Sequence, residues 1–137
     1  MQPGAYLTKP LIKICCVQSI AEARTVIKAG ASAIGLVSAM PSGPGVIDEA
    51  LIAEIASAVP APVETFLLTS EQVASRIIEQ HHICRTTTIQ LVDQVEVGEL
   101  VKLRQSLPDI RLVQVIHVVD DASLLEASEL AATELAA

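Results

Sequence analysis

The side chains best suited to chemistry are the thiol of Cys15 and the ammonium of Lys13, two positions apart in the aliphatic run 11–17. Side chains alternate between the two faces of a β-strand, so both groups are expected on one face. A neighbouring cation lowers the pKa of a thiol, which makes Cys15 a candidate base or nucleophile. The alternatives are a small thiol that packs beside Cys16 and a Lys13 that pairs with Glu64.

Polar side chains also end two later strands of the expected fold. Gln90 and Asp93 close the run 86–92, and His117 closes the run 110–118. Gln90 is a candidate for a hydrogen bond to substrate, whereas Asp93 is interpreted as a loop or capping residue. His117 titrates near neutrality and is a candidate general acid or base, although a structural or solvated imidazole is the commoner case.

The remaining polar clusters have structural interpretations. His81 and His82 come at the end of an expected helix, where imidazoles interact with the helix dipole, and Cys84 precedes a strand. The loop 42–45 is glycine-rich, but Pro44 has no amide to offer a phosphate, so we interpret the loop as a turn. The sequence has no Cys-x-x-Cys or spaced His and Cys cluster, so no metal site is expected.

Aliphatic runs alternate with helical patterns five times along the chain. We expect strands at 11–17, 31–38, 63–68, 86–92 and 110–118, each followed by a helix, the last of which runs to the chain end. No linker or low-complexity segment separates these βα units. The pattern predicts an α/β protein with a parallel sheet and a single, partial β/α barrel domain over 1–137.

Short-range signals mark where the helices begin. Ser19 with Glu22, and Thr69 with Gln72, have the spacing of a capping box, in which two side chains bind the free amides of a helix start. A further helix is expected to start at Asp48 or Ile47, and Asp120 or Asp121 is expected to cap the last helix.

Two architectures accommodate five consecutive βα units. A flavodoxin-like doubly wound sheet is complete at 137 residues, whereas a (β/α)8 barrel normally needs about 250. Both faces of a doubly wound sheet lie under helices, so its central strands are apolar throughout. Here Thr86, Thr88 and Gln90 share a face of one strand, and Glu64 and Gln114 interrupt two others. One polar face per strand favours a TIM-barrel-type fold truncated to about five units, with the doubly wound sheet as the alternative.

Composition limits the classes of partner. The 137 residues are 51% hydrophobic and carry a net charge of -7, with a pI near 4.8. This hydrophobicity excludes a disordered chain, and the acidic balance argues against nucleic acid or an anionic membrane as the main partner. No apolar run approaches the ~20 residues of a membrane-spanning helix. The neighbours Cys15 and Cys16 cannot easily bridge to each other, and the odd number of cysteines leaves one thiol over, which favours a reduced, cytoplasmic compartment.

Three segments resemble the phosphoribosylanthranilate isomerase family. The run Leu11-Ile-Lys-Ile-Cys15 is similar to that family's opening Lys-Ile-Cys-Gly strand, and Ala29-Gly-Ala-Ser-Ala-Ile-Gly-Leu-Val37 is similar to its Gly-Ala-Asp-Ala-Leu-Gly-Phe segment. Thr88-Ile-Gln-Leu-Val92 stands where the family has Val-Gln-Leu-His-Gly. The resemblance spans nearly the whole chain and corresponds to the family's first five βα units.

The resemblance implies a cofactor-free barrel that carries out an Amadori aldose–ketose isomerisation of a phosphoribosyl-aminobenzoate in tryptophan biosynthesis. The family's catalytic cysteine corresponds to Cys15, which would act as general base at the ribose C2. Lys13 and Gln90 are the expected substrate-binding residues, and a small phosphorylated sugar is the expected partner. The family's general acid is an aspartate on its sixth strand, and its phosphate site follows strands seven and eight.

The sequence departs from the family's pattern at three positions. The glycine after the cysteine is Cys16 here, the loop arginine falls at Pro44, and the histidine of the fourth-strand motif falls at Val92. Three hypotheses follow: a partial isomerase-like barrel, a barrel for another sugar phosphate, and a non-enzymatic flavodoxin-like binding or interaction module. For an open barrel we also expect a homo-oligomer that covers the unpaired edge strands.

Overall fold

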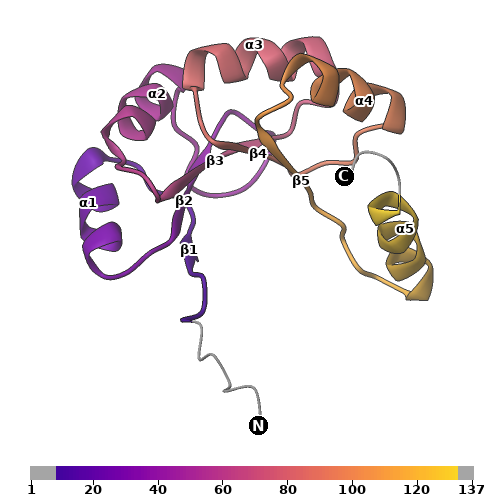
Figure 1. Ribbon diagram of the computed structural model, residues 1–137, viewed down its shortest axis with the longest axis horizontal. Coiled ribbons are helices and arrows are strands. Elements are labelled where there is room, and N and C mark those ends of the chain that lie inside the picture. Colours follow the sequence, from indigo (N-terminus) through magenta and orange to yellow (C-terminus); the bar gives the residue numbers. More distant parts are fainter. Residues whose placement is uncertain (1–8, 133–137) are drawn as a thin grey trace, which may run out of the picture.

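The computed structural model describes residues 9–132, in which strands and helices alternate along the chain (Figure 1). The elements are β1 (Lys13–Ile14), α1 (Ile20–Lys28), β2 (Ala33–Val37), α2 (Glu49–Ala58), β3 (Glu64–Thr69), α3 (Ala74–Cys84), β4 (Thr88–Leu91), α4 (Val97–Ser106), β5 (Arg111–Gln114) and α5 (Asp121–Ala131). None of these helices is long and apolar enough to cross a membrane. The expected continuation of the last helix to the chain end lies outside the described residues.

The strands form one parallel sheet in the order β1-β2-β3-β4-β5. Consecutive strands are therefore neighbours throughout, whereas a flavodoxin-like sheet has the order 2-1-3-4-5. The register places Gly35, Phe66, Thr88 and Arg111 side by side across β2 to β5. The sequential order makes the doubly wound alternative wrong and confirms a β/α-barrel-type sheet of five units.

Helices α1 to α4 cover one face of the sheet, and α5 lies beyond β5 (Figure 1). Under the helices, Ile34 and Leu36 of β2 and Leu67 of β3 pack against Ile52 and Ile55 of α2. A second apolar cluster joins β4 to α3 and α4 in the same way. Burial of one strand face under one layer of helices is the arrangement of the outer ring of a barrel.

Two of the expected helix caps are confirmed, and Asp48 caps the helix that was expected to start there. The Ser19 hydroxyl accepts a hydrogen bond from the Glu22 amide at 3.0 Å, and Glu22 Oε2 accepts one from the Gln18 amide at 2.7 Å. Asp48 and Asp120 each accept a hydrogen bond from the backbone amide three residues further on, at 2.8 and 2.9 Å. These side chains satisfy amides that have no partner within the helix.

The capping box expected at Thr69 and Gln72 is wrong. Helix α3 begins at Ala74, and its N-cap residue Val73 makes no side-chain cap hydrogen bond. Thr69 is fully buried at the end of β3, and its hydroxyl donates to Gln80 Oε1 at 2.6 Å. The Thr69 hydroxyl thus binds a partner distant in the sequence, Gln80, whereas the local pattern predicted a bond at the helix start.

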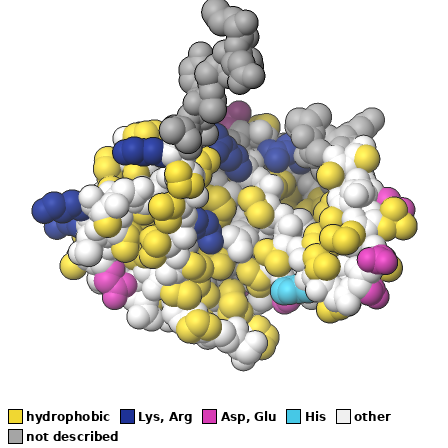
Figure 2. Space-filling model, turned by 90° about the horizontal axis from the view of Figure 1, so that it is seen from below, with side chains coloured by type: hydrophobic (Ala, Val, Ile, Leu, Met, Phe, Trp, Pro, Cys, Tyr) yellow, Lys and Arg dark blue, Asp and Glu magenta, His cyan; other side chains and the backbone are white. Residues whose placement is uncertain are grey.

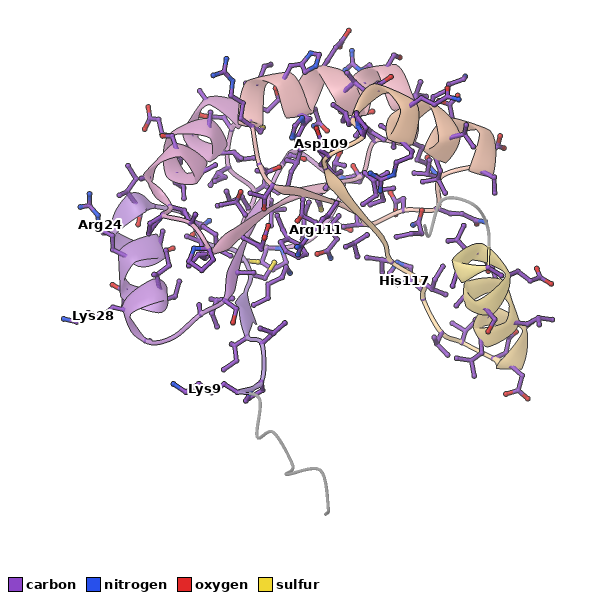
Figure 3. The ribbon with its side chains drawn as sticks, in the orientation of Figure 1. Lys9, Arg24, Lys28, Asp109, Arg111 and His117 are labelled. Carbon is purple, nitrogen blue, oxygen red and sulfur yellow. The ribbon has the colours of Figure 1, made fainter. Side chains whose placement is uncertain are left out.

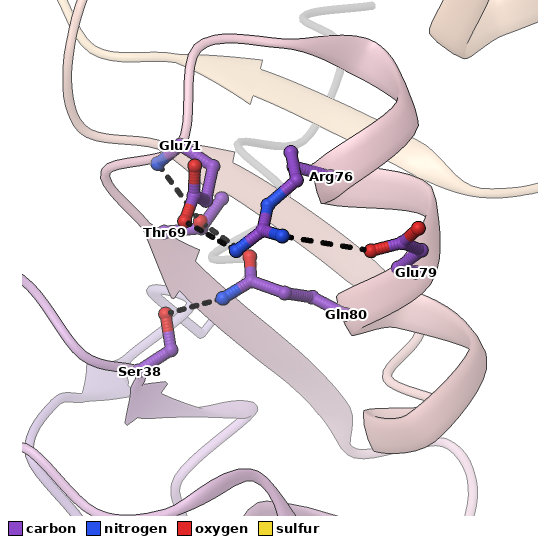
Figure 4. A network of polar contacts seen from close by, with 6 residues as sticks. All are labelled: Ser38, Thr69, Glu71, Arg76, Glu79 and Gln80. Atoms are coloured by element: carbon purple, nitrogen blue, oxygen red, sulfur yellow. Dashed lines mark hydrogen bonds and ion pairs between the residues drawn. The ribbon is translucent and has the colours of Figure 1, made fainter.

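This hydrogen bond belongs to a polar network that joins α3 to the ends of β2 and β3 (Figure 4). Gln80 Nε2 donates to Ser38 Oγ at 3.4 Å, and the Ser38 hydroxyl donates to the Leu68 carbonyl at 2.7 Å. At the surface, Arg76 lies 4.0 Å from Glu71. The network fixes the carboxyl ends of two strands, which is where the loops of a barrel build their site.

The two edge strands are shorter than the expected ranges 11–17 and 110–118. β1 ends early because Cys16 has a φ of 60°, in the left-handed region, which interrupts an extended backbone. The chain then returns to the sheet, where the Val17 amide donates to the Gly35 carbonyl at 3.1 Å. On the other side, β5 pairs with β4 alone among the described strands.

No helix of residues 9–132 covers the other face of the sheet, which we call the open face (Figure 1). Figure 2 looks onto it and shows a hollow in which hydrophobic side chains gather, with Lys and Arg side chains toward one side. In a closed barrel this face is the interior. The described chain is therefore a section of a barrel wall with two edges, β1 and β5.

Candidate functional site

Cys15 directly follows β1, and its side chain is exposed on the open face. A Cβ added to Gly35 of β2 would lie 2.8 Å from the Cys15 sulfur and 3.2 Å from the Cys15 Cα. Gly35 therefore leaves the space that the thiol occupies, and Leu68 borders the same space at 3.3 Å from that Cβ position. The structure places an accessible thiol at the carboxyl end of a barrel strand.

Lys13 shares the open face with Cys15, as expected. Its ammonium lies 5.2 Å from the centroid of the Phe66 ring, within the range of a cation–π interaction. Glu64, the other partner considered for Lys13, instead faces Arg111, with 3.7 Å between Oε1 and Nη1. These side chains border a hollow of about 540 Å³ at the amino ends of the strands.

The Glu64–Arg111 ion pair is a feature that the sequence analysis missed. It connects β3 to β5 across β4, on the open side of the sheet (Figure 3). The small side chain of Thr88 in β4 leaves room for the arginine to reach over. Only the register between strands brings the two charges together, and the sequence carries no local signal for that register.

Cys16 lies between Cys15 and the turn 42–45. Its thiol donates a weak hydrogen bond to the Pro44 carbonyl, at 3.6 Å between sulfur and oxygen. Partial burial raises the pKa of the Cys16 thiol, Cys15 raises it further, and the Lys13 ammonium acts in the opposite direction. The family's glycine corresponds to this residue, and glycine is the residue that adopts a positive φ most easily.

Gln90 lies in β4 on the open face, between Leu68 of β3 and Val113 of β5, and is half-buried. Like Cys15, it is near the carboxyl end of its strand. Leu68 stands between the two, because it also borders the space beside the Cys15 thiol. The structure thus brings a thiol and an amide to the same end of the open face, on either side of an apolar side chain.

His117 does not end a strand, contrary to the sequence-based expectation. β5 stops at Gln114, and His117 lies in the exposed segment between β5 and α5 (Figure 3). Its Nε2 atom is 3.1 Å from the Val92 carbonyl. Asp93 follows β4, and its carbonyl accepts a hydrogen bond from Gln114 Nε2 at 2.9 Å. These contacts connect the ends of two neighbouring strands.

The other candidates have the structural roles that were expected of them. His81 is buried, with Nε2 2.8 Å from the Thr86 carbonyl. Cys84 is fully buried, and this burial raises the pKa of its thiol to about 12. Asp120 caps α5, and hydrogen bonds from Ser123 hold the pKa of its carboxyl below the usual value. Between residues 9 and 132, no three His, Cys, Asp or Glu side chains are grouped as a metal ion requires.

The chain is part of a β/α barrel of the TIM type, because its strands are in sequential order and one layer of helices covers the sheet. The candidate site adds a thiol at the end of β1. No family model matches the sequence. The sequence is similar to N-(5'-phosphoribosyl)anthranilate isomerase 2 of Methanosarcina mazei, with 28% identity over 109 residues. That match covers 79% of this chain and 48% of the relative, so the chain spans about half of the relative's length.

Two solved structures have the same fold. One is a phosphoribosylanthranilate isomerase in complex with reduced 1-(o-carboxyphenylamino)-1-deoxyribulose 5-phosphate, with a TM-score of 0.78, 18% identity, and coverage of 88% of this chain and 60% of that one. The other is a monomeric form of the dimeric isomerase of Thermotoga maritima, with a TM-score of 0.77 and the same identity and coverage. These comparisons confirm the resemblance that the motifs predicted and the barrel-type fold.

Proposed function

We propose that the chain provides the first five βα units of a phosphoribosylanthranilate isomerase-type barrel, as one partial domain over 1–137. The reaction would be the Amadori isomerisation of a phosphoribosyl-aminobenzoate, in tryptophan biosynthesis. The observation that carries the proposal is the exposed Cys15 thiol, at the carboxyl end of the first strand of a sheet that superposes on such isomerases.

Cys15 is proposed as the general base. The ligand in the related complex is a deoxyribulose derivative, in which C2 of the sugar corresponds to the ketose carbonyl. To form a ketose from an aldose, a base must remove the proton from C2, and the thiolate of an accessible cysteine can do so within hydrogen-bond reach. Gly35 supports this role because it leaves the space beside the sulfur free of a side chain.

Lys13 and Gln90 are proposed to bind the substrate. Gln90 faces the open side at the same end as Cys15, where its amide can donate to and accept from sugar hydroxyls. Lys13 lies two residues before Cys15 on the same face of β1, where its positive charge attracts an anionic substrate. A small phosphorylated sugar is accordingly the proposed ligand.

The general acid and the phosphate site of the family belong to later βα units, which have no counterpart among the described elements. We propose that catalysis needs these later units, and that a second copy of the chain covers the edges at β1 and β5 where they are absent. The three cysteines are unpaired, which supports a reduced, cytoplasmic setting.

The test is turnover of phosphoribosylanthranilate by the full chain mixed with a polypeptide that carries the last three βα units of the M. mazei isomerase. We expect isomerisation by the mixture, and a loss of about 10²-fold or more with Cys15→Ser, the usual contribution of a general base. Cys84→Ala, at a buried position away from the open face, is the matched control and keeps the wild-type rate. A stable complex with no turnover would contradict the proposal, and equal rates for Cys15→Ser would remove Cys15 as the base.

A second candidate substrate is a sugar phosphate without the benzoate carboxylate. It is favoured by Pro44, which stands where the family has an arginine and whose carbonyl instead accepts from Cys16. Proline has no cationic group for a carboxylate. Faster turnover by the same mixture of a phosphorylated aminoaldose that lacks the carboxylate would select this substrate, and a preference for phosphoribosylanthranilate would reject it.

A further inference from the structure

Cys15 and Cys16 form a pair of adjacent thiols at the end of β1. The Cys15 side chain is exposed, the Cys16 side chain is partly exposed, and Cys15 raises the pKa of the Cys16 thiol. Cys84, in contrast, is completely buried at the end of α3. Of the three thiols of the chain, the adjacent pair alone combines a neighbouring thiol with access to solvent.

Glycines confine both sulfurs. A Cβ at Gly35 would lie 2.8 Å from the Cys15 sulfur, and a Cβ at Gly45 would lie 2.8 Å from the Cys16 sulfur and 2.6 Å from the Cys16 Cβ. The backbone of each glycine thus approaches one of the two thiols closely. The pair lies between β2 and the turn 42–45, and the two thiols belong to consecutive residues.

We propose that Cys15 and Cys16 are a site of reversible two-electron oxidation by hydroperoxides, which closes a vicinal disulfide. The regulatory consequence rests on the role proposed above for Cys15, since a sulfur in a disulfide cannot act as a base. The oxidation itself does not depend on that role. The oxidant that reacts at this site is a hydroperoxide, of which hydrogen peroxide is the simplest.

The chemistry proceeds in two balanced steps. The Cys15 thiolate, as the more exposed sulfur, attacks one peroxide oxygen, the O–O bond breaks, and the products are a sulfenic acid and hydroxide. The Cys16 sulfur then attacks the Cys15 sulfenic sulfur, the S–O bond breaks, and the oxygen leaves as water with the Cys16 proton. In sum, two thiols and one hydrogen peroxide give one disulfide and two waters.

The position of the two residues explains why the product is reversible. Consecutive Cα atoms across a trans peptide are about 3.8 Å apart, below the usual range of about 4.4–6.8 Å for disulfide-bonded residues. A bond closed under this constraint is easily reduced by cellular thiols, and such labile disulfides are the regulatory ones. Cys16 already has a left-handed backbone, with a φ of 60°, at the residue that would close this bond.

Mass spectrometry of the full chain tests the proposal without any assay of activity. Trypsin cleavage after Lys13 and Arg24 releases peptide 14–24, which contains Cys15 and Cys16, and cleavage after Arg76 and Arg85 releases peptide 77–85 with Cys84. After stoichiometric hydrogen peroxide, we expect peptide 14–24 to lose two hydrogens and to regain them with dithiothreitol. Peptide 77–85 is expected to stay unchanged, because its thiol is buried.

Two variants separate the disulfide from other oxidations. In Cys16→Gly, which suits the positive φ, Cys15 has no resolving thiol and is expected to gain oxygen atoms, the more so as peroxide increases. Cys15→Ser is expected to show no loss of two hydrogens. Oxygen addition to wild-type peptide 14–24 without loss of hydrogen, an unreacted peptide, or a disulfide between two chains would each overturn the proposal.

A separate arm tests the regulation. In the complemented mixture described above, peroxide is expected to abolish isomerisation by wild type and dithiothreitol to restore it fully. Cys16→Gly is expected to recover only the activity lost as sulfenic acid, because the higher oxygen adducts of Cys15 resist dithiothreitol. A disulfide that forms while the mixture shows no turnover at all would contradict the proposed function and leave the oxidation site standing. A disulfide that forms without changing turnover would overturn the regulatory role of the site.

Discussion

At the scale of single residues, the candidate site depends on glycines as much as on its polar groups. Gly35 and Gly45 leave the spaces that the sulfurs of Cys15 and Cys16 occupy. Cys16 is the opposite case, because a residue with a side chain adopts a left-handed φ of 60°, which glycine adopts most easily. This backbone conformation costs about 1–2 kcal/mol for an L-residue. The chain thus accepts backbone strain at the position that places a second thiol beside the first.

Gly35→Ala is predicted to lower the free energy of unfolding by about 1–3 kcal/mol, because its Cβ would meet both the sulfur and the Cα of Cys15. Displacement of the thiol is also expected to slow its alkylation by iodoacetamide. Gly98→Ala is the matched control, since nothing lies within 4 Å of a Cβ at this helical position. That variant should gain up to about 1 kcal/mol from helix propensity. Urea denaturation measures both, and equal changes would contradict the close approach at Gly35.

The buried thiol of Cys84 predicts a loss of stability at alkaline pH. Burial, helped by the charge of Glu49, raises the pKa of this thiol from 9.0 to about 12 in the folded state. Below pH 9 both states hold the proton, so the contribution is fully present. Between pH 9 and 12 the unfolded thiol ionises while the folded one does not. The free energy of unfolding should then fall by at most about 1.4 kcal/mol per pH unit.

Urea denaturation of wild type and Cys84→Ala at a series of alkaline pH values measures this effect. The alanine variant loses packing at every pH but lacks the titrating thiol, so its stability should fall less steeply than that of wild type above pH 9. Cys15 and Cys16 are present in both proteins and cancel in the comparison. Parallel slopes would show that Cys84 does not keep its proton in the folded state.

At the scale of helices and strands, the sequence predicted what short-range physics decides. The cap at Ser19 and Glu22 formed as expected because both partners lie within one helical turn. The same spacing at Thr69 and Gln72 failed because Thr69 is buried at the end of β3 and its hydroxyl finds Gln80. Element order and the alternation of strand faces were predictable, whereas partners distant in the sequence were not.

The same distinction between local patterns and long-range contacts applies to the candidate site. The shared face of Lys13 and Cys15 was predictable because side-chain alternation is a local property of a strand. That Gln90 of β4 lies on the same side of the sheet depends on strand register. The cation–π contact of Lys13 and the left-handed Cys16 were not predictable either, because each depends on how β1 lies against its neighbours. Sequence reasoning therefore predicted faces within a strand better than contacts between strands.

The buried network at the ends of β2 and β3 gives an element-scale prediction. Thr69→Val removes the hydroxyl that donates to Gln80 Oε1 at 2.6 Å and leaves a buried oxygen without that donor. The expected loss in the free energy of unfolding is about 1–3 kcal/mol. The double variant Thr69→Val with Gln80→Leu, which removes both partners, should recover part of that loss. Thermal and urea unfolding of wild type, the two single variants and the double variant measure this double-mutant cycle. Strictly additive changes in the free energy of unfolding would argue against a direct coupling of Thr69 and Gln80.

At the scale of the whole molecule, the sheet has one face covered by α1 to α4 and one open face, with β1 and β5 as its edges. Unpaired edge strands and an exposed apolar face favour association, because an edge offers free amides and carbonyls to a second strand. Val113 and Val101 are almost equally exposed and lie on opposite sides of the sheet. Val113 of β5 is 38% exposed on the open face, and Val101 of α4 is 37% exposed among the helices.

We therefore predict that the full chain has a solution mass above 14.4 kDa, the mass of one copy, at micromolar concentration. Val113→Glu places a charge on the open face at an edge strand and should shift the mass toward one copy, because a buried unpaired carboxylate is costly. Val101→Glu introduces the same charge at equal exposure on the helical side and should leave the mass unchanged. Light scattering after size-exclusion chromatography measures all three proteins. A folded wild-type monomer at this concentration, or equal dissociation by both variants, would contradict association through the open face.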